Sequence, residues 1–170
     1  MESGKRDRDM EVQTTHRKPR VLLAASGSVA AIKFGNLCHC FREWAEVRAV
    51  VSKSSLPFLD RLSLPREGAG TRSIAGGLCD NLLTCIIRAW DYSKPLFVAP
   101  AMNTLMWNSP FTERHLLTLD ELGVTLIPPI KKRLACGDYG NGAMAEPSLI
   151  YSTVRLFWES QAHQQSAGTS

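Results

Sequence analysis

The sequence predicts an α/β protein in which helices cover both faces of a parallel sheet. Short apolar runs such as RVLLAA at 20–25 and VTLIPP at 124–129 alternate with longer segments of helical character. Strands that are apolar throughout are typical of a sheet buried on both faces. The chain has 170 residues, 44% of them hydrophobic and 21% charged, which suits one domain with a real core and excludes a fibrous or wholly disordered protein.

Capping and turn residues indicate where the elements begin and end. Ser109 and Pro110 suit the start of a helix that stops at Gly123, and Pro57 suits the first turn of a shorter one. We expect strands at 20–25, 46–52, 96–100 and 124–129, helices at 29–44, 56–62, 74–90, 109–122 and 147–160, and a glycine-rich loop at 137–142.

The two ends of the chain are predicted to be disordered. Residues 1–19 are polar, mixed in charge and end in Pro19, and residues 161–170 read QAHQQSAGTS. We therefore expect an arm at 1–19, one domain at 20–160 and a tail at 161–170.

Charge and cysteine content exclude several partners. The net charge is only +4, and the one tight basic cluster, at 131–133, is interpreted as a solvated loop, so we expect no nucleic-acid partner. No apolar run approaches the ~18 residues of a membrane span and no signal region is present, which predicts a cytoplasmic protein without a membrane partner. The five cysteines form no CxxC pair, and no histidine has metal-ligand spacing, so we expect reduced thiols and no metal site.

The turn after the first strand is a candidate anion site. Gly27 lets the turn close, while the hydroxyls of Ser26 and Ser28 and the N–H groups of the following helix are available to an anion. The G-x-G-x-x-G motif is absent, and 52–54 reads Ser-Lys-Ser where an NAD site usually has an acidic residue. This favours a phosphate or a mononucleotide, and an ordinary turn without a ligand is the alternative.

Two further segments carry candidate chemistry. In PAMNTLMW, which follows a predicted strand, Asn103 offers an amide to a ligand, with a helix cap as the alternative. Met102, Met106 and Trp107 offer apolar surface for a flat ring or are simply core. In KKRLACGDYGNGAMAEP, the glycines suit a mobile lid in which Cys136 is a proton donor, a nucleophile or a passive thiol.

The segments ASGSVAAIKF, GGLCDNLLTCIIRAWDYSKPLFVAPAMNTLMW and KKRLACGDYGNGAMAEP together resemble the homo-oligomeric flavin-containing cysteine decarboxylases, most closely the plant phosphopantothenoylcysteine decarboxylase (halotolerance protein) branch. The resemblance covers nearly the whole chain. It implies a flavodoxin-like, doubly wound parallel sheet in three α/β/α layers, FMN as cofactor and a homotrimer. It also implies the decarboxylation of phosphopantothenoylcysteine to phosphopantetheine in coenzyme A biosynthesis.

The resemblance assigns roles to individual residues. Those expected to bind FMN are Ser28, Val29, Ala30, Ser52, Lys53, Ser54 and Ala101. Asn103 is expected to bind the substrate carboxylate, and the other substrate contacts are Arg133, Ala135 and Met144. Cys136 is expected to be the proton donor of the reductive half-reaction.

Two motifs of the family have no counterpart in this chain. One is the histidine that precedes a helix and is the base of the oxidative step, and the other is a Ser-Ala-Asn-Thr turn that grips FMN. The pattern breaks near Glu67 and resumes near Ile74, so we predict that a central βαβ piece of roughly 30 or more residues is missing. The neighbouring strands should then be unpaired and the oxidative step impaired. The alternative is a non-catalytic regulatory or decoy subunit, related to phosphatase inhibitors, that joins full-length chains in mixed trimers.

Overall fold

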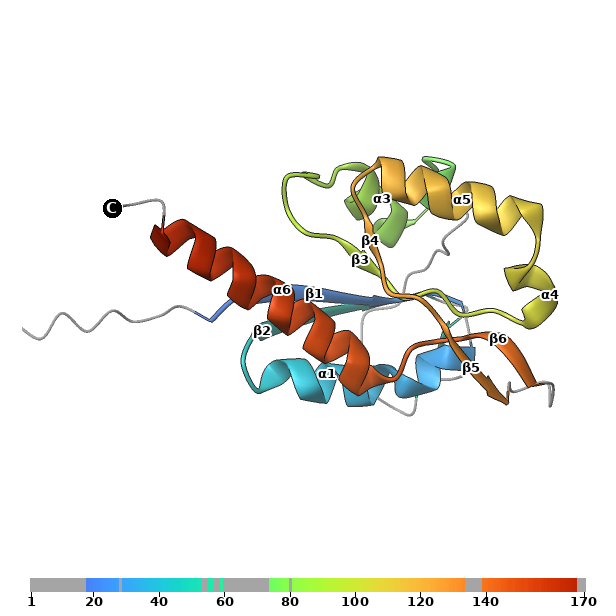
Figure 1. Cartoon of the computed structure of the whole chain (residues 1–170), viewed down its shortest axis with the longest axis horizontal. Helices are drawn as coiled ribbons and strands as arrows, with labels where there is room; N and C mark the ends of the chain where they lie inside the picture. The colour runs from blue at the N-terminus through green and yellow to red at the C-terminus, as the bar shows by residue number, and fades with distance from the viewer. Residues whose placement is uncertain are drawn as a thin grey trace, which may run out of the picture.

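The structure is a computed structural model that describes residues 18–27, 29–52, 55–56, 59, 74–79, 81–133 and 139–167 (Figure 1). Nearly all of the predicted arm and most of the predicted helix at 56–62 lie outside this range. Of the helices in the described part, none is long and apolar enough to span a membrane.

Four strands of the described chain form two parallel pairs. β1 (Arg20–Ala25) pairs with β2 (Glu46–Val51) over its whole length, and β3 (Phe97–Val98) pairs with β4 (Thr125–Leu126). Parallel strands require crossover connections, and helices provide them here. This confirms the predicted α/β class.

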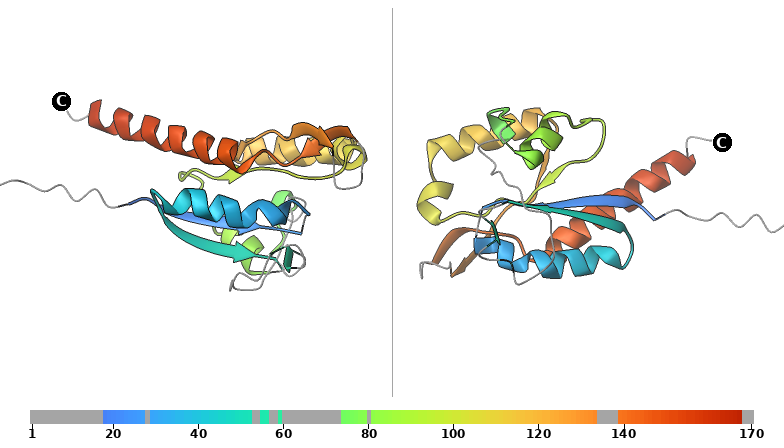
Figure 2. Two further views of the ribbon diagram at one scale, coloured as in Figure 1. Left: turned by 90° about the horizontal axis from the view of Figure 1, so that it is seen from below. Right: turned by 180° about the vertical axis from the view of Figure 1, so that it is seen from behind.

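Helices lie on both sides of the strands, as the predicted three-layer arrangement requires. Figures 1 and 2 show α3 and α5 on one side and α1 and α6 on the other. In chain order the helices are η1 (Val29–Lys33), α1 (Phe34–Arg42), α3 (Leu82–Arg88), α4 (Thr104–Trp107), α5 (Pro110–Glu121) and α6 (Pro147–Ala167).

One apolar core joins the two strand pairs. Leu23 of β1, Phe41 of α1, Ile127 after β4 and Ile150 of α6 belong to the same buried cluster. At its centre the rings of Phe41 and Tyr151 meet edge to face, with centroids 5.5 Å apart. Helices α1 and α6 therefore hold together strands that share no backbone hydrogen bonds in the described chain.

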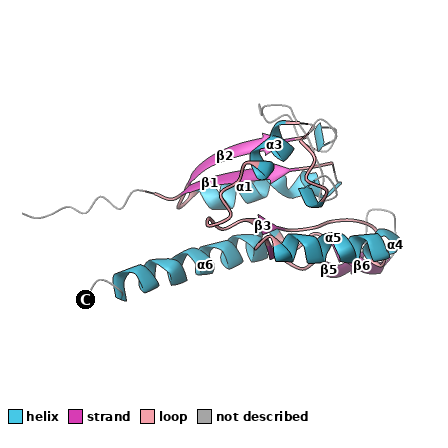
Figure 3. Cartoon of the chain, turned by 90° about the horizontal axis from the view of Figure 1, so that it is seen from above, coloured by secondary structure: helices cyan, strands magenta, loops and turns pink. Residues whose placement is uncertain are grey.

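The gap in the sheet lies between β1 and β3. Within the described residues β1 pairs only with β2, and β3 pairs only with β4. Figure 3 shows β1, β2, α1 and α3 as one group beside the elements from β3 onward. Leu22 of β1 is 37% exposed, although the sequence predicts a strand buried on both faces. Unpaired neighbours and an uncovered strand face are the expected result of a missing central strand.

Several predicted elements are shorter in the structure. β3 and β4 have two residues each; Pro95 and Pro100 lie on either side of β3, Pro128 follows β4, and a proline cannot donate to a ladder. The helix predicted at 74–90 is interrupted at Gly77, whose φ is +61°. It starts again at Asn81, which forms a capping box with Thr84.

The predictions of loops are wrong for residues 131–133 and 139–142, while residues 137 and 138 lie outside the described residues. β5 (Ile130–Arg133) and β6 (Tyr139–Ala143) form an antiparallel hairpin, so the basic cluster lies in a strand. Glycines are normally poor strand residues, but here Gly142 lets β6 pass close to the backbone of Met102, and Gly140 lets it pass close to the side chain of Thr104.

The prediction of a disordered tail is wrong for residues 161–167, because α6 continues to Ala167. Gln and Ala favour helix, and no glycine or proline follows Pro147 until Gly168. An ion pair between Arg155 and Glu159, at 2.8 Å, adds support one turn earlier.

Candidate functional site

Two buried serines bind the ends of β1 and β2 together. Gly27 donates its N–H to Ser52 Oγ at 2.8 Å, and Ser55 N–H donates to the same oxygen at 2.9 Å. The two hydroxyl oxygens lie 2.6 Å apart, and Ser55 Oγ donates to Ala25 O at 3.1 Å. Both serines are completely buried. Ser52 therefore shapes the turn from beneath, and a direct contact with a ligand stays a prediction.

The turn itself is open at the carboxyl end of β1. Gly27 is exposed with a φ of +33°, and η1 begins two residues later at Val29. The first N–H groups of a helix have no partner within the helix and attract anions. The geometry of Gly27, Val29 and Ala30 thus suits a phosphate. The predicted residues Ser28, Lys53 and Ser54 lie outside the described residues.

Asn103 lies between β3 and α4 and caps that helix. Its side-chain Oδ1 accepts the N–H of Met106 at 2.8 Å, so the helix-cap interpretation is confirmed. The amide is exposed, and its Nδ2 can serve as a donor in addition to this cap. The side chain of Met106 is also exposed, so it is not core; Ala101 is half-buried.

The β5–β6 hairpin docks on the PAMN segment (residues 100–103). Met102 donates its N–H to Gly142 O at 2.9 Å. A Cβ at Gly142 would lie 2.3 Å from Met102 O, and a Cβ at Gly140 would lie 2.1 Å from Thr104 Oγ1. Only glycine permits such close approach. The spacing of these two glycines therefore serves docking of the hairpin beside Asn103.

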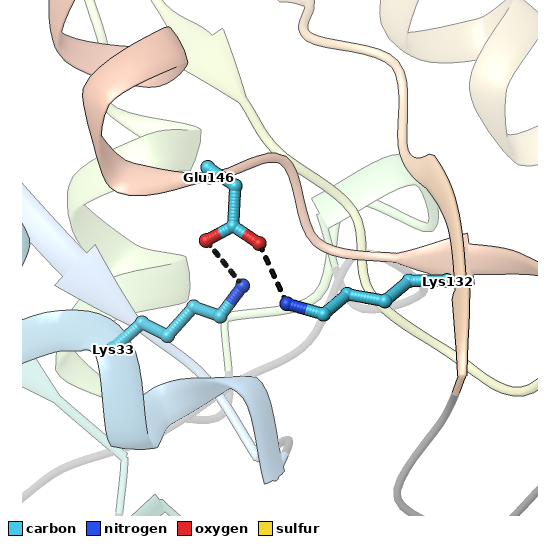
Figure 4. Close-up of polar contacts among 3 residues, drawn as sticks. All are labelled: Lys33, Lys132 and Glu146. Atoms are coloured by element: carbon cyan, nitrogen blue, oxygen red, sulfur yellow. Dashed lines mark hydrogen bonds and ion pairs between the residues drawn. The ribbon is translucent and has the colours of Figure 1, made fainter.

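Glu146 connects the hairpin to the first turn (Figure 4). Its Oε2 lies 2.8 Å from Lys33 Nζ on η1, and its Oε1 lies 3.0 Å from Lys132 Nζ on β5. Hydrogen bonds from Lys33 and then Lys132 hold the pKa of the Glu146 carboxyl below its ordinary value. Nothing in the local sequence predicts this role, because the three residues are far apart in the chain.

The structure thus gathers part of the predicted site on one side of the molecule, where Figure 1 shows η1, α4 and the β5–β6 hairpin. Arg133 is exposed at the end of β5, and Met144 is half-buried after β6 and packs against the core. Ala135 and Cys136 lie outside the described residues, in the segment between β5 and β6.

The described histidines all lie within helices. His39 is on α1, His115 on α5 and His163 on α6, and none follows the carboxyl end of a described strand. This agrees with the absence from the sequence of the family's histidine motif. A hollow of about 480 Å³ between α4 and α5 is lined by Trp107, one of the predicted apolar residues, but by none of the residues expected to contact FMN or the substrate.

A family model described as Flavoprotein matches residues 71–158, just over half of the chain. The chain belongs to the Flavoprotein family. Within the family it is 73% identical to a phosphopantothenoylcysteine decarboxylase of Arabidopsis thaliana, in an alignment that covers all of both chains. The resemblance inferred from the motifs is confirmed.

Solved structures of Flavoprotein-family members share this fold. One is a Cys-to-Ser mutant of a PPC decarboxylase complexed with pantothenoylaminoethenethiol, with a TM-score of 0.79 and 70% identity, covering 84% of this chain and all of that one. Another is the FMN binding protein AtHal3, with a TM-score of 0.76 and 70% identity, covering 85% of this chain and 98% of that one. The flavodoxin-like fold class is therefore confirmed.

The alignment with the Arabidopsis relative shows how many residues this chain lacks. It spans 209 positions, whereas this chain has 170 residues, so at least 39 positions hold no residue of this chain. A βαβ-sized unit of about 30 or more residues has this length. The Flavoprotein match begins at residue 71, within the segment where the sequence pattern resumes.

Proposed function

We propose that this protein is an FMN-dependent carboxy-lyase of coenzyme A biosynthesis that binds phosphopantothenoylcysteine. The observation that carries the proposal is the hydrogen bond between Met102 N and Gly142 O, which seats the hairpin beside Asn103. Relatives named phosphopantothenoylcysteine decarboxylase, at up to 73% identity, support the same substrate. The reaction needs a flavin, a carboxylate site and a shielded proton donor.

The turn after β1 fits the phosphate end of FMN. Positive φ at Gly27 and the buried Ser52 hydroxyl shape the turn, and η1 begins two residues after Gly27, at Val29. We assign the flavin contacts to Ser28, Val29, Ala30, Ser52, Lys53, Ser54 and Ala101. Bound there, FMN would supply a reversible hydride acceptor for the oxidation and later reduction of the cysteinyl moiety.

The residues of this chain position the substrate and its proton. Asn103 Nδ2 donates to the substrate carboxylate while Oδ1 stays on the helix, and Arg133 contacts the substrate from the end of β5 with Ala135 and Met144. The hairpin excludes water from the reacting carbon. Cys136, in the segment that β5 and β6 enclose, supplies a proton from its thiol in the reductive half.

Replacing Asn103 by aspartate tests the carboxylate site. Aspartate is an equally good N-cap, so N103D keeps the bond to Met106 N–H and the fold. It removes the donor and adds a like charge, and hydrogen bonds to charged groups are worth about 1.5–3 kcal/mol. We therefore expect KM for phosphopantothenoylcysteine to rise by roughly 10- to 100-fold, with FMN affinity and thermal stability unchanged.

Steady-state assays of CO₂ release and FMN titrations on the same preparation measure these quantities. Asn108→Asp, at the other end of α4, is the control for an added charge at an exposed asparagine. Unchanged kinetics in N103D would show that Asn103 acts only as a helix cap.

We propose further that the oxidative step is impaired in this chain. The support is the missing histidine motif and the absence, within the described residues, of any strand paired with the second edge of β1 or of β3. We expect a flavin-loaded protein that releases CO₂ at least tenfold more slowly than the Arabidopsis relative. Equal rates under identical conditions would refute this proposal.

We propose that the chain assembles as a homotrimer or as a mixed trimer with full-length subunits. Large apolar side chains on η1, α4 and α5 are exposed, among them Ile32, Leu105 and Phe111. Co-expression with a tagged Arabidopsis relative, followed by native mass spectrometry, tests this. A mixed trimer without activity favours the regulatory role, and absence of any mixed trimer rules that role out.

We also place the protein in the cytoplasm. The described cysteines are thiols rather than disulfides, which suits a reducing compartment. Imaging of a fluorescent fusion checks the location, and retention in a membrane-bounded compartment would contradict it.

A further inference from the structure

Two cysteine sulfurs face each other beside α3. Cys79 Sγ lies 2.8 Å from Cys85 Sγ, so the gap to a disulfide bond of about 2.05 Å is less than 1 Å. No role is assigned to either residue in the decarboxylation proposed above.

The N-terminus of α3 is built so that the two sulfurs meet. Asn81 accepts the N–H of Thr84 at 3.0 Å, and Thr84 Oγ1 accepts the N–H of Asn81 at 3.1 Å, which fixes the chain as it enters the helix. Cys85 follows in the next turn, facing back toward the residues that precede the cap. Arg88 donates to Gly77 O and so holds the incoming segment on the same helix. Three separate contacts thus keep Cys79 close to Cys85.

The pair is open to small reagents. Cys79 is exposed and Cys85 is half-buried, so an oxidant can reach the first sulfur while the second is shielded. By contrast, Cys38 is buried in α1, and burial raises the pKa of its thiol, an effect that Arg42 partly opposes. Thiolates are the reactive form, so Cys38 should be slow to oxidise.

We propose that Cys79 and Cys85 form a reversible dithiol/disulfide pair that responds to peroxide. The Cys79 thiolate attacks a peroxide oxygen, an S–O bond forms and the O–O bond breaks, and the departing hydroxide takes a proton to become water. The Cys85 thiolate then attacks the sulfenic sulfur, the S–S bond forms, and the S–O bond breaks with release of a second water. Two thiols are oxidised and one hydrogen peroxide is reduced, and an external dithiol reverses the step.

The disulfide would fix one wall of a cavity. Gly77 and Leu78 line a hollow of about 310 Å³. Its other walls include Ile87 of α3 and Thr118 of α5. In the reduced protein, segment 74–79 is held on α3 by hydrogen bonds. Oxidation ties it covalently, so the amides of this segment should exchange more slowly with solvent.

Peptide mapping tests the proposal on the full chain with all its cysteines. After treatment with equimolar hydrogen peroxide and blocking with iodoacetamide, trypsin releases residues 73–88 as one peptide that holds Cys79 and Cys85 alone. We expect this peptide to be two hydrogen masses lighter and unalkylated, and to regain both thiols after dithiothreitol. The peptide Phe34–Arg42 also holds two cysteines, Cys38 and Cys40, and should remain fully alkylated as the internal control.

Single Cys→Ser variants distinguish a Cys79–Cys85 disulfide from other oxidation products. Cys79→Ser and Cys85→Ser should each abolish the light peptide and the slowed exchange at 74–79, whereas Cys40→Ser should change neither. Both thiols of 73–88 still alkylated after peroxide would overturn the proposal. So would a bond from either residue to Cys136, or a bond between two chains.

Discussion

Two glycines with positive φ have very different surroundings. A Cβ at Gly142 would lie 2.3 Å from Met102 O, whereas a Cβ at Gly123, where φ is +79°, would meet nothing within 4 Å. Left-handed backbone costs a non-glycine residue on the order of 1–3 kcal/mol at either position. At Gly142 the clash also breaks the bond from Met102 N–H, which is worth about 1 kcal/mol.

We therefore expect Gly142→Ala to lower the free energy of unfolding by roughly 1 kcal/mol more than Gly123→Ala does. Chemical denaturation of both variants measures the difference. Gly142→Ala should also weaken substrate binding, because the hairpin loses its hydrogen bond to Met102. Gly123→Ala should leave substrate binding unchanged. Equal losses in the two variants would mean that the hairpin contact contributes nothing beyond the backbone conformation.

Single residues are predictable from sequence where their function is local. Gly27 in the first turn and Asn103 before a helix follow from turn and capping chemistry, and both have those roles in the structure. Glu146 and Gly140 depend on partners far along the chain, at Lys33 and Thr104, so no local pattern indicates them. Ser52 is intermediate, because the sequence predicts it as a flavin contact but predicts neither its burial beneath the turn nor its bond to Ser55.

At the level of elements, the two ion pairs of Glu146 hold the β5–β6 hairpin to η1. We expect Glu146→Gln to accelerate hydrogen exchange at the amides of β5 and β6, because two ion pairs are lost together. Glu159→Gln is the matched control, since Glu159 pairs with Arg155 within α6 and touches neither strand. Faster exchange in both variants, or in neither, would contradict the anchoring role.

The same anchor has a predictable pH dependence. The folded pKa of Glu146 is lowered, so its contribution is complete above the ordinary value of 4.5 and is lost as the pH falls through the folded pKa. Exchange at β5 and β6, corrected for its intrinsic pH dependence, should therefore rise below about pH 4.5 in the wild-type chain. In Glu146→Gln the corrected exchange should be flat over this range, and a parallel rise would rule out Glu146 as the titrating group.

Elements with a clear apolar period are predictable, and those that depend on tertiary contacts are not. The bounds of β1 match the predicted strand, and α5 starts at the predicted proline. β6 has a glycine-rich sequence that predicts a loop, and it becomes a strand only because β5 and the PAMN segment pair with its backbone. α6 is longer than the predicted helix, because the polar sequence after Ser160 is typical of disorder but forms exposed helix here.

For the molecule as a whole, the gap in the sheet is the main departure from its family. Inserting the unmatched segment of the Arabidopsis relative between Glu67 and Ile74 should pair the open edges of β1 and β3. We expect a higher Tm, slower hydrogen exchange along both strands and at least a tenfold faster release of CO₂. A Gly/Ser insert of equal length is the control, and an equal gain from it would show that chain length alone is limiting.

The shared core across the gap has a consequence for how the molecule unfolds. β1–β2 and β3–β4 have no common ladder in the described chain, so α1 and α6 transmit stability between the halves through side chains alone. Cooperative unfolding normally relies on both kinds of connection. The two helices meet at Phe41 and Tyr151. This contact therefore couples the unfolding of one strand pair to that of the other. When that contact loosens, the halves can open one at a time, and the turn after β1 and the β5–β6 hairpin then lie on different units.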